Sequence, residues 1–156
     1  MCDDDLERVV DIASVCYPDH PEDMAIFKER LRLFPRGCLA LAGGGSASGY
    51  LLSYPWTADS APPLNALVLR LPETPEAYYL HDLALMPARR GQGHARAGIE
   101  FLRNELAGGL PLTLVSVNGT VPFWERHGFR VRRTPALDAK LASYGRDARF
   151  MVAGQH

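Results

Sequence analysis

The sequence predicts a single domain of the α+β (mixed α/β) class, and three observations lead to this prediction. Along the chain, the hydrophobic periodicity predicts two helices, a strand hairpin, and then strand, helix, strand, helix and strand. A length of 156 residues suits one domain with a real core, and the chain has no repeats or interdomain linker. A composition of 47% hydrophobic and 22% charged residues is typical of a globular protein. We therefore expect one domain over residues 1–156.

The first half of the chain contains two predicted helices and a hairpin. Leu6 to Val15 has apolar residues near helical spacing behind capping aspartates, and Glu22 to Phe34 repeats this pattern until a proline. Cys38 to Ala42 is a short apolar strand, and a glycine-rich turn joins it to its partner, Gly49 to Tyr54. The proline-rich connection from Pro55 to Glu76 is long for a compact domain, so we interpret it as a candidate substrate lid.

The second half alternates strands and helices. Ala77 to Met86 has the apolar density of a central strand, and a glycine-rich turn leads from it into a helix, Ala95 to Leu106. Leu110 to Val117 is another buried strand, closed by an Asn-Gly pair. A short helix and two strands complete the sheet, at Val121–His127, Phe129–Arg132 and Ala148–Val152.

The turn Arg90-Gly91-Gln92-Gly93-His94-Ala95 is the most informative segment. Glycines at a helix entrance let backbone N–H groups approach an anion, and the positive end of the helix dipole favours phosphate there. Arg90, at the start of the turn, adds a guanidinium that can donate two hydrogen bonds to a phosphate. The spacing matches neither the Walker pattern nor the dinucleotide-binding glycine pattern. The turn therefore predicts a site for a pyrophosphate-bearing ligand, while a plain packing turn is the alternative.

Charge and composition exclude several other classes of partner. A net charge of −1 gives no basic excess, so we expect no nucleic acid. No apolar run approaches the roughly 18–20 residues that span a bilayer, so we expect no membrane partner. Three widely spaced cysteines, Cys2, Cys16 and Cys38, form neither a disulfide framework nor a zinc motif. We therefore expect no metal and a cytoplasmic location.

Two motifs together resemble the GNAT superfamily of N-acetyltransferases. The turn from Arg90 to Ala95 is similar to the Q/R-x-x-G-x-G/A pyrophosphate motif of that family, and Phe123 to Phe129 resembles its aromatic-x-x-x-Gly-Phe helix end. The resemblance covers most of the chain from Cys38 onward and implies a central, mostly antiparallel twisted sheet flanked by helices. It also implies acetyl-CoA as donor, a primary amine as acceptor, direct attack in a ternary complex, and a homodimer, since dimers are common among such proteins.

The resemblance assigns the acetyl-CoA site to the turn and to the strand before it. Backbone groups of the strand would pair with the pantetheine arm as an added strand does, and backbone amides of the turn would hold the pyrophosphate. An asparagine after the next strand often bonds to the pantetheine in this family, although Asn-Gly also reads as a simple turn. The expected contacts are Leu83, Ala84, Leu85, Arg90, Gly91, Gln92, Gly93, His94, Ala95, Arg96 and Asn118.

Acetyl transfer to an amine needs a base for the ammonium proton, and His81 is the strongest candidate in the sequence. A neutral imidazole accepts a proton at physiological pH, while a hydrogen-bonded structural histidine is the alternative interpretation. Strand alternation places Tyr79 on the same face as His81 and Asp82 on the other face. We expect Asp82 to act directly, to orient a neighbour or to bind a substrate ammonium.

This chain differs from the family pattern at the residue that would protonate the CoA thiolate as it leaves. Trp124 stands where many family members carry a tyrosine, and an indole cannot supply a proton at useful pH. Tyr144 is the best substitute acid in the sequence.

Three segments resemble the serotonin-type arylalkylamine branch of the superfamily, namely Leu80–Leu85, Ser53–Trp56 and Pro62–Leu64. This resemblance implies a small primary amine, aromatic or polyamine-like, and an extended loop suits a small, enclosed acceptor. The residues expected to contact the amine are Tyr54, Trp56, Tyr79 and Trp124. Two alternatives stay open, namely acetylation of a protein N-terminus or lysine, and CoA binding without turnover.

Overall fold

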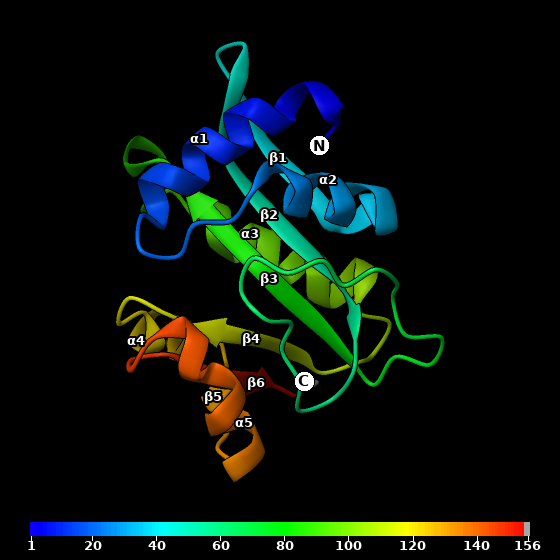
Figure 1. Ribbon diagram of the computed structural model, residues 1–156. Coiled ribbons are helices and arrows are strands. Elements are labelled where there is room, and N and C mark those ends of the chain that lie inside the picture. The colour runs from blue at the N-terminus through cyan, green and yellow to red at the C-terminus, as the bar shows by residue number, and fades with distance from the viewer. Residues whose placement is uncertain (155–156) are drawn as a thin grey trace.

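The computed structural model describes residues 1–154 and contains one six-stranded sheet with helices on both faces (Figure 1). The strands follow the order β1-β2-β3-β4-β6-β5 across the sheet. Every pairing is antiparallel except that of β3 with β4, which confirms the predicted fold class. The strand bounds are β1 Cys38–Gly43, β2 Ser46–Trp56, β3 Ala77–Leu85, β4 Leu112–Ser116, β5 Arg130–Val131 and β6 Arg149–Ala153.

Five α-helices surround this sheet in the described part of the chain. They are α1 Leu6–Cys16, α2 Met24–Leu33, α3 His94–Phe101, α4 Val121–Arg126 and α5 Pro135–Lys140. The predicted helix from Ala95 to Leu106 is α-helical only to Phe101 and then continues as a π-helical segment, η4 (Leu102–Leu106). Helix α5 was not predicted, although Thr134 and Pro135 form a recognisable start: the Thr134 hydroxyl accepts from the Leu137 N–H at 3.1 Å.

Apolar side chains of the sheet form two cores on opposite faces. On one face, Leu80 and Leu114 pack with Ile99 of α3 and Trp124 of α4. On the other face, side chains of β2 pack with α1 and α2. A third cluster lies around Tyr144, near the end of β3 that begins at Ala77. Among residues 1–154, no helix combines the length and the hydropathy needed to cross a membrane.

The parallel contact between β3 and β4 is very short. Only Tyr78 and Tyr79 have partners on β4, while β3 continues to Leu85. Residues 81–83 are half-buried, and yet the His81 side chain is only 3% exposed, so at this residue the exposed atoms belong mostly to the backbone. The two strands therefore part, and beyond Tyr79 the β3 backbone has no hydrogen-bonding partner on β4.

A β-bulge interrupts the pairing of β2 with β3 at His81. Leu52 pairs with Asp82 and Ser53 pairs with Leu80, so His81 is the extra residue. The prediction that His81 and Asp82 face opposite sides was therefore wrong. Both side chains lie on the face that carries α1 and α2, because Asp82 accepts a hydrogen bond from Tyr50 of that core and His81 contacts the segment before α2.

The long connection between β2 and β3, residues 57–76, crosses this same face, and we call it the strap (Figure 1). Glu29 accepts from two successive strap N–H groups, those of Val68 at 2.8 Å and Leu69 at 3.0 Å. The Arg30 guanidinium pairs with Glu29 and donates to the strap carbonyl of Ala66 at 3.0 Å. A strap that opened as a lid would have to break these bonds.

Three strap residues, Asp59, Asn65 and Leu69, have a positive φ, and Leu69 is the one whose apolar side chain is least suited to it. Leu69 has a φ of +66°, a conformation that costs an L-residue about 1–2 kcal/mol, and its side chain gains little because it is 72% exposed. We expect Leu69→Gly to leave the free energy of unfolding unchanged or to raise it by up to about 1 kcal/mol, because strain relief offsets the entropy of glycine. Urea unfolding measures this change. Leu67→Gly is the matched control: Leu67 is also exposed but has no positive φ, so this change should only destabilise.

Candidate functional site

A cavity of about 920 Å³ opens where β3 and β4 part. It brings together most of the predicted site residues: Tyr79, His81, Asp82, Leu83, Leu85, Arg90, Gly91, Gly93, His94, Ala95, Arg96, Asn118, Trp124 and Tyr144. Four predicted residues do not line it. Ala84 is buried against α1 and α2, and the Gln92 side chain donates back to Ala88. Tyr54 packs against His81, and Trp56 packs edge-on against Tyr54.

The glycine turn forms one end of the cavity. Gly91 and Gly93 have φ values of +72° and +83°, and Gly93 is the residue that precedes helix α3. A Cβ atom at either glycine would meet no other atom within 4 Å, so the turn backbone faces open space. Arg90 folds back, donating through Nε to the Leu85 carbonyl at 3.1 Å. The first turn of α3 therefore presents amides and the positive helix end to the cavity.

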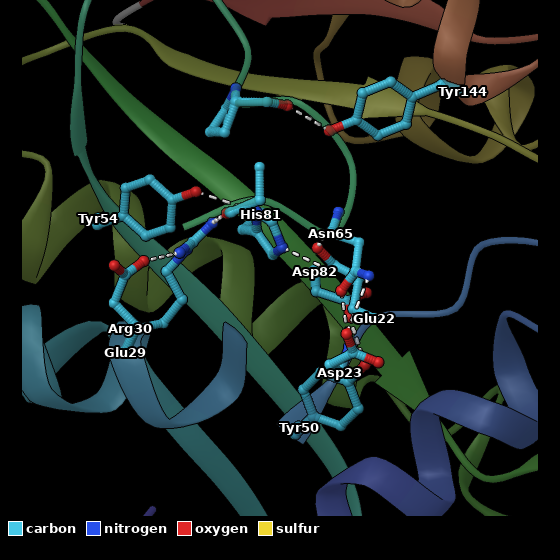
Figure 2. Close-up of polar contacts among 12 residues, drawn as sticks. Glu22, Asp23, Glu29, Arg30, Tyr50, Tyr54, Asn65, His81, Asp82 and Tyr144 are labelled. Atoms are coloured by element: carbon cyan, nitrogen blue, oxygen red, sulfur yellow. Dashed lines mark hydrogen bonds and ion pairs between the residues drawn. The ribbon is translucent and has the colours of Figure 1, made fainter. Parts of the chain in front are cut away.

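His81 lies between two partners, and both of its ring nitrogens are occupied (Figure 2). Nε2 is 2.8 Å from a carboxylate oxygen of Glu22, and Nδ1 is 3.0 Å from the Tyr54 hydroxyl. Burial raises the pKa of Glu22, but the neighbouring His81 and the Asn65 N–H outweigh burial and hold this pKa below its ordinary value. An ionised Glu22 requires a hydrogen on Nε2, so in neutral His81 the Nδ1 lone pair faces Tyr54.

Asp82 lies next to His81 on the wall of the cavity. One of its carboxylate oxygens accepts from the Tyr50 hydroxyl (Figure 2). Tyr17, which donates to the Leu83 carbonyl, lies close by. Burial raises the pKa of Asp82 to about 6, against the opposing effects of His81 and the two tyrosines. This value lies in the range that suits a proton acceptor at neutral pH.

Tyr144 lines the opposite side of the cavity from η5 (Leu141–Tyr144). Its hydroxyl donates to the strap carbonyl of Pro62 (Figure 2), and burial raises the pKa of this phenol. Trp124 also faces the cavity and packs edge-on against Phe129, with ring centroids 5.5 Å apart. To protonate a departing thiolate, Tyr144 would first have to release Pro62.

Asn118 lies in a turn and also lines the cavity. Asn118 and Gly119, with φ values of +54° and +68°, form a tight turn after β4. The Gly119 N–H donates to Asp147 at 3.0 Å. At the same time Asn118 lines the cavity. The turn geometry therefore does not remove this residue from the site.

Sequence reasoning missed Glu22, Tyr17 and Tyr50. Glu22 precedes α2 and is 59 positions from His81, and its other oxygen accepts from the Asn65 N–H of the strap at 3.1 Å. No local motif marks any of these residues. The packing of α1 and α2 on the sheet brings Tyr17 and Glu22 to β3, and the pairing of β2 with β3 brings Tyr50 there. Among residues 1–154, no three His, Cys, Asp or Glu side chains gather in a way that could hold a metal ion.

Comparisons with known proteins agree with this geometry. The model of the acetyltransferase (GNAT) family matches residues 6–129. A solved structure of the GphF GNAT-like decarboxylase in complex with isobutyryl-CoA is 16% identical, with a TM-score of 0.74 over 100% of this chain and 97% of that one. The loading GNATL domain of CurA from Lyngbya majuscula is 12% identical, with a TM-score of 0.74 over 97% and 93% of the two chains.

A third similar structure is Naa50 of Arabidopsis thaliana in complex with the bisubstrate analogue CoA-Ac-MVNAL. It is 10% identical, with a TM-score of 0.65 over 97% of this chain and 93% of that one. The search of curated proteins finds no match. Since the family model spans most of the sequence and the fold agrees with it, this chain belongs to the GNAT family of acetyltransferases.

Proposed function

We propose that the protein transfers the acetyl group of acetyl-CoA to the primary amine of a small molecule, by direct attack in a ternary complex. The observation that carries this proposal is the parting of β3 and β4 beside the glycine turn, within one cavity. The complexes of GphF with isobutyryl-CoA and of Naa50 with a CoA conjugate support a CoA thioester as donor.

The parts of the cavity suit the parts of acetyl-CoA. Amides from Gly91 to Arg96 would hold the pyrophosphate, and the β3 stretch from Leu83 to Leu85, which is unpaired with β4, would bond to the pantetheine. Its N–H groups would make these bonds, because the Leu83 and Leu85 carbonyls already accept from Tyr17 and Arg90. An N–H of the same unpaired stretch would stabilise the thioester oxygen as negative charge develops. The candidates for proton transfer are His81, Asp82 and Tyr144.

The charges that line the cavity also differ between its two ends. Arg90 and Arg96 belong to the turn segment, whereas Glu22 and Asp82 lie at the other end, beside the apolar side chain of Leu64. A cationic end suits the phosphates of CoA, and carboxylates beside an apolar wall suit an ammonium on an apolar body. This arrangement favours an amine over a carboxylate-bearing acceptor.

The side of the cavity near Glu22 is closed by contacts between the strap and the segment before α2. Asn65 accepts from the Asp23 N–H at 2.8 Å and donates through its side chain to the Asp23 carboxylate at 3.2 Å. Together with the bond from Asn65 to Glu22, these contacts favour a small acceptor over an extended peptide. Among small amines, the similarity of Leu80–Leu85 to the arylalkylamine branch favours aromatic ones.

A protein N-terminus is the second candidate acceptor, because Naa50 binds an analogue that joins CoA to a peptide. A panel of aromatic amines, polyamines and short peptides, assayed for thiol release from acetyl-CoA, separates the two candidates. We expect release with at least one small amine and little with peptides. Release with peptides alone would contradict the small-molecule proposal, and CoA binding without release from any acceptor would indicate a non-catalytic module.

A further inference from the structure

We propose that Asp82, rather than His81, takes the proton from the acceptor ammonium, and that the β-bulge at His81 places it there. This inference rests on the proposed amine acetyltransferase function. It assigns the proton-accepting group within that site to Asp82, whereas the sequence alone favours His81.

The His81 side chain has no free lone pair to offer. Its imidazole is only 3% exposed, Nε2 is bonded to Glu22, and Nδ1 faces the buried Tyr54 hydroxyl. A general base must come within hydrogen-bond reach of the proton that it removes. An amine in the cavity would have to displace Glu22 or Tyr54 before His81 could accept its proton.

Asp82 lines the cavity, and a carboxylate has enough lone pairs to accept from an amine while it keeps its bond from Tyr50. Because His81 is the extra residue of the bulge, the next side chain also lies on the α1–α2 face, where it lines the cavity. The hydrogen bond from Tyr50 reaches one carboxylate oxygen, Oδ2, and the neighbouring β3 backbone is the stretch that would bind the thioester. The carboxylate thus lies next to the place where the reacting carbon is expected.

The groups that face Asp82 keep it ionised near neutral pH. Burial raises its pKa to about 6, and His81, Tyr50 and Tyr17 oppose that rise, while Glu22 adds to it. Tyr144 also lies within electrostatic range. Tyr50 is therefore a positioning residue, because its hydroxyl stabilises the charged form of Asp82 and fixes its rotamer.

The proposed step balances in protons and charge. The Asp82 carboxylate takes one proton from R–NH₃⁺ and becomes a neutral acid, and the amine lone pair forms the new C–N bond at the thioester carbon. The C–S bond breaks as the tetrahedral adduct collapses, and the second N–H proton ends on the CoA thiolate. Asp82 then loses its proton to solvent.

The pH profile of kcat/KM tests this assignment with the best amine of the panel. In the wild type we expect kcat/KM to increase with pH as Asp82 ionises, with the midpoint of this increase near pH 6. We call this increase the acidic limb of the pH profile. Asp82→Asn should lower kcat/KM by about 10²- to 10⁴-fold and abolish that limb. This variant should fold, since it removes a buried charge and keeps an acceptor for Tyr50, and its affinity for CoA by calorimetry should be unchanged.

Two further variants separate the proton acceptor from its surroundings. Tyr50→Phe removes a donor to the charged form of Asp82, so the limb should move to higher pH rather than vanish. His81→Asn should retain a limb, whatever its effect on the rate. A limb that persists in Asp82→Asn and disappears in His81→Asn would overturn the assignment while leaving the acetyltransferase function intact. A wild type that acetylates no amine would instead overturn the proposed function, and the Asp82 assignment with it.

Discussion

Arg30→Met should lower the free energy of unfolding by about 3–5 kcal/mol. Arg30 and its partner Glu29 are only 1% and 7% exposed, and together they bind three backbone groups of the strap, at Ala66, Val68 and Leu69. Removing the guanidinium leaves a buried carboxylate without its countercharge, which costs more than the pair itself contributes. Urea unfolding followed by circular dichroism measures the change.

Two further variants show whether the unpaired charge is the cause. The double variant Glu29→Gln with Arg30→Met should recover part of the lost stability, because no buried charge is left without a partner. Arg96→Ala breaks an exposed pair with Glu100 and should leave the unfolding transition where it is. An Arg30→Met protein as stable as the wild type would show that the strap is not held by this pair.

Gly91→Asp should weaken CoA binding by about 10- to 100-fold, or about 1.4–2.8 kcal/mol. Gly91 lies in the turn that would hold the pyrophosphate, at a φ of +72°. An aspartate there places a negative charge beside the two phosphates, in the open space that the turn backbone faces. Isothermal titration calorimetry with CoA measures the loss.

Gly91→Asn is the matched control for this change. Asparagine has nearly the shape of aspartate and tolerates the same positive φ, but it carries no charge. The asparagine variant should therefore keep more affinity than the aspartate variant, and the gap should narrow at high salt. Equal, undiminished affinities in both variants would place the pyrophosphate elsewhere.

Local sequence patterns predicted the parts of the site that are contiguous in the chain. The turn from Arg90 to Ala95 is recognisable because glycines must accept positive φ values where β3 meets α3, and Gly91 and Gly93 do so. The predicted alternation of side chains along β3 was wrong at His81. A one-residue bulge depends on the pairing with β2 and cannot be recognised from the sequence of the strand itself.

Contacts made by residues far apart in the chain could not be predicted in this way. Glu22 and Tyr17 reach β3 only after α1 and α2 pack on the sheet, and Tyr50 reaches it through the pairing of β2 with β3. Their contacts with His81, Leu83 and Asp82 therefore follow from tertiary structure. The sequence predicts Tyr144 as the substitute acid, and only the tertiary structure shows that its hydroxyl is bonded to Pro62 on the strap. In each case the partner is more than 30 positions away.

The most direct test of the central claim is calorimetric titration of the folded protein with acetyl-CoA and with CoA. If the parted strands and the α3 turn form a CoA thioester site, both ligands should bind at one site per chain, and Gly91→Asp should weaken both. No binding of either ligand by folded wild-type protein would contradict the account.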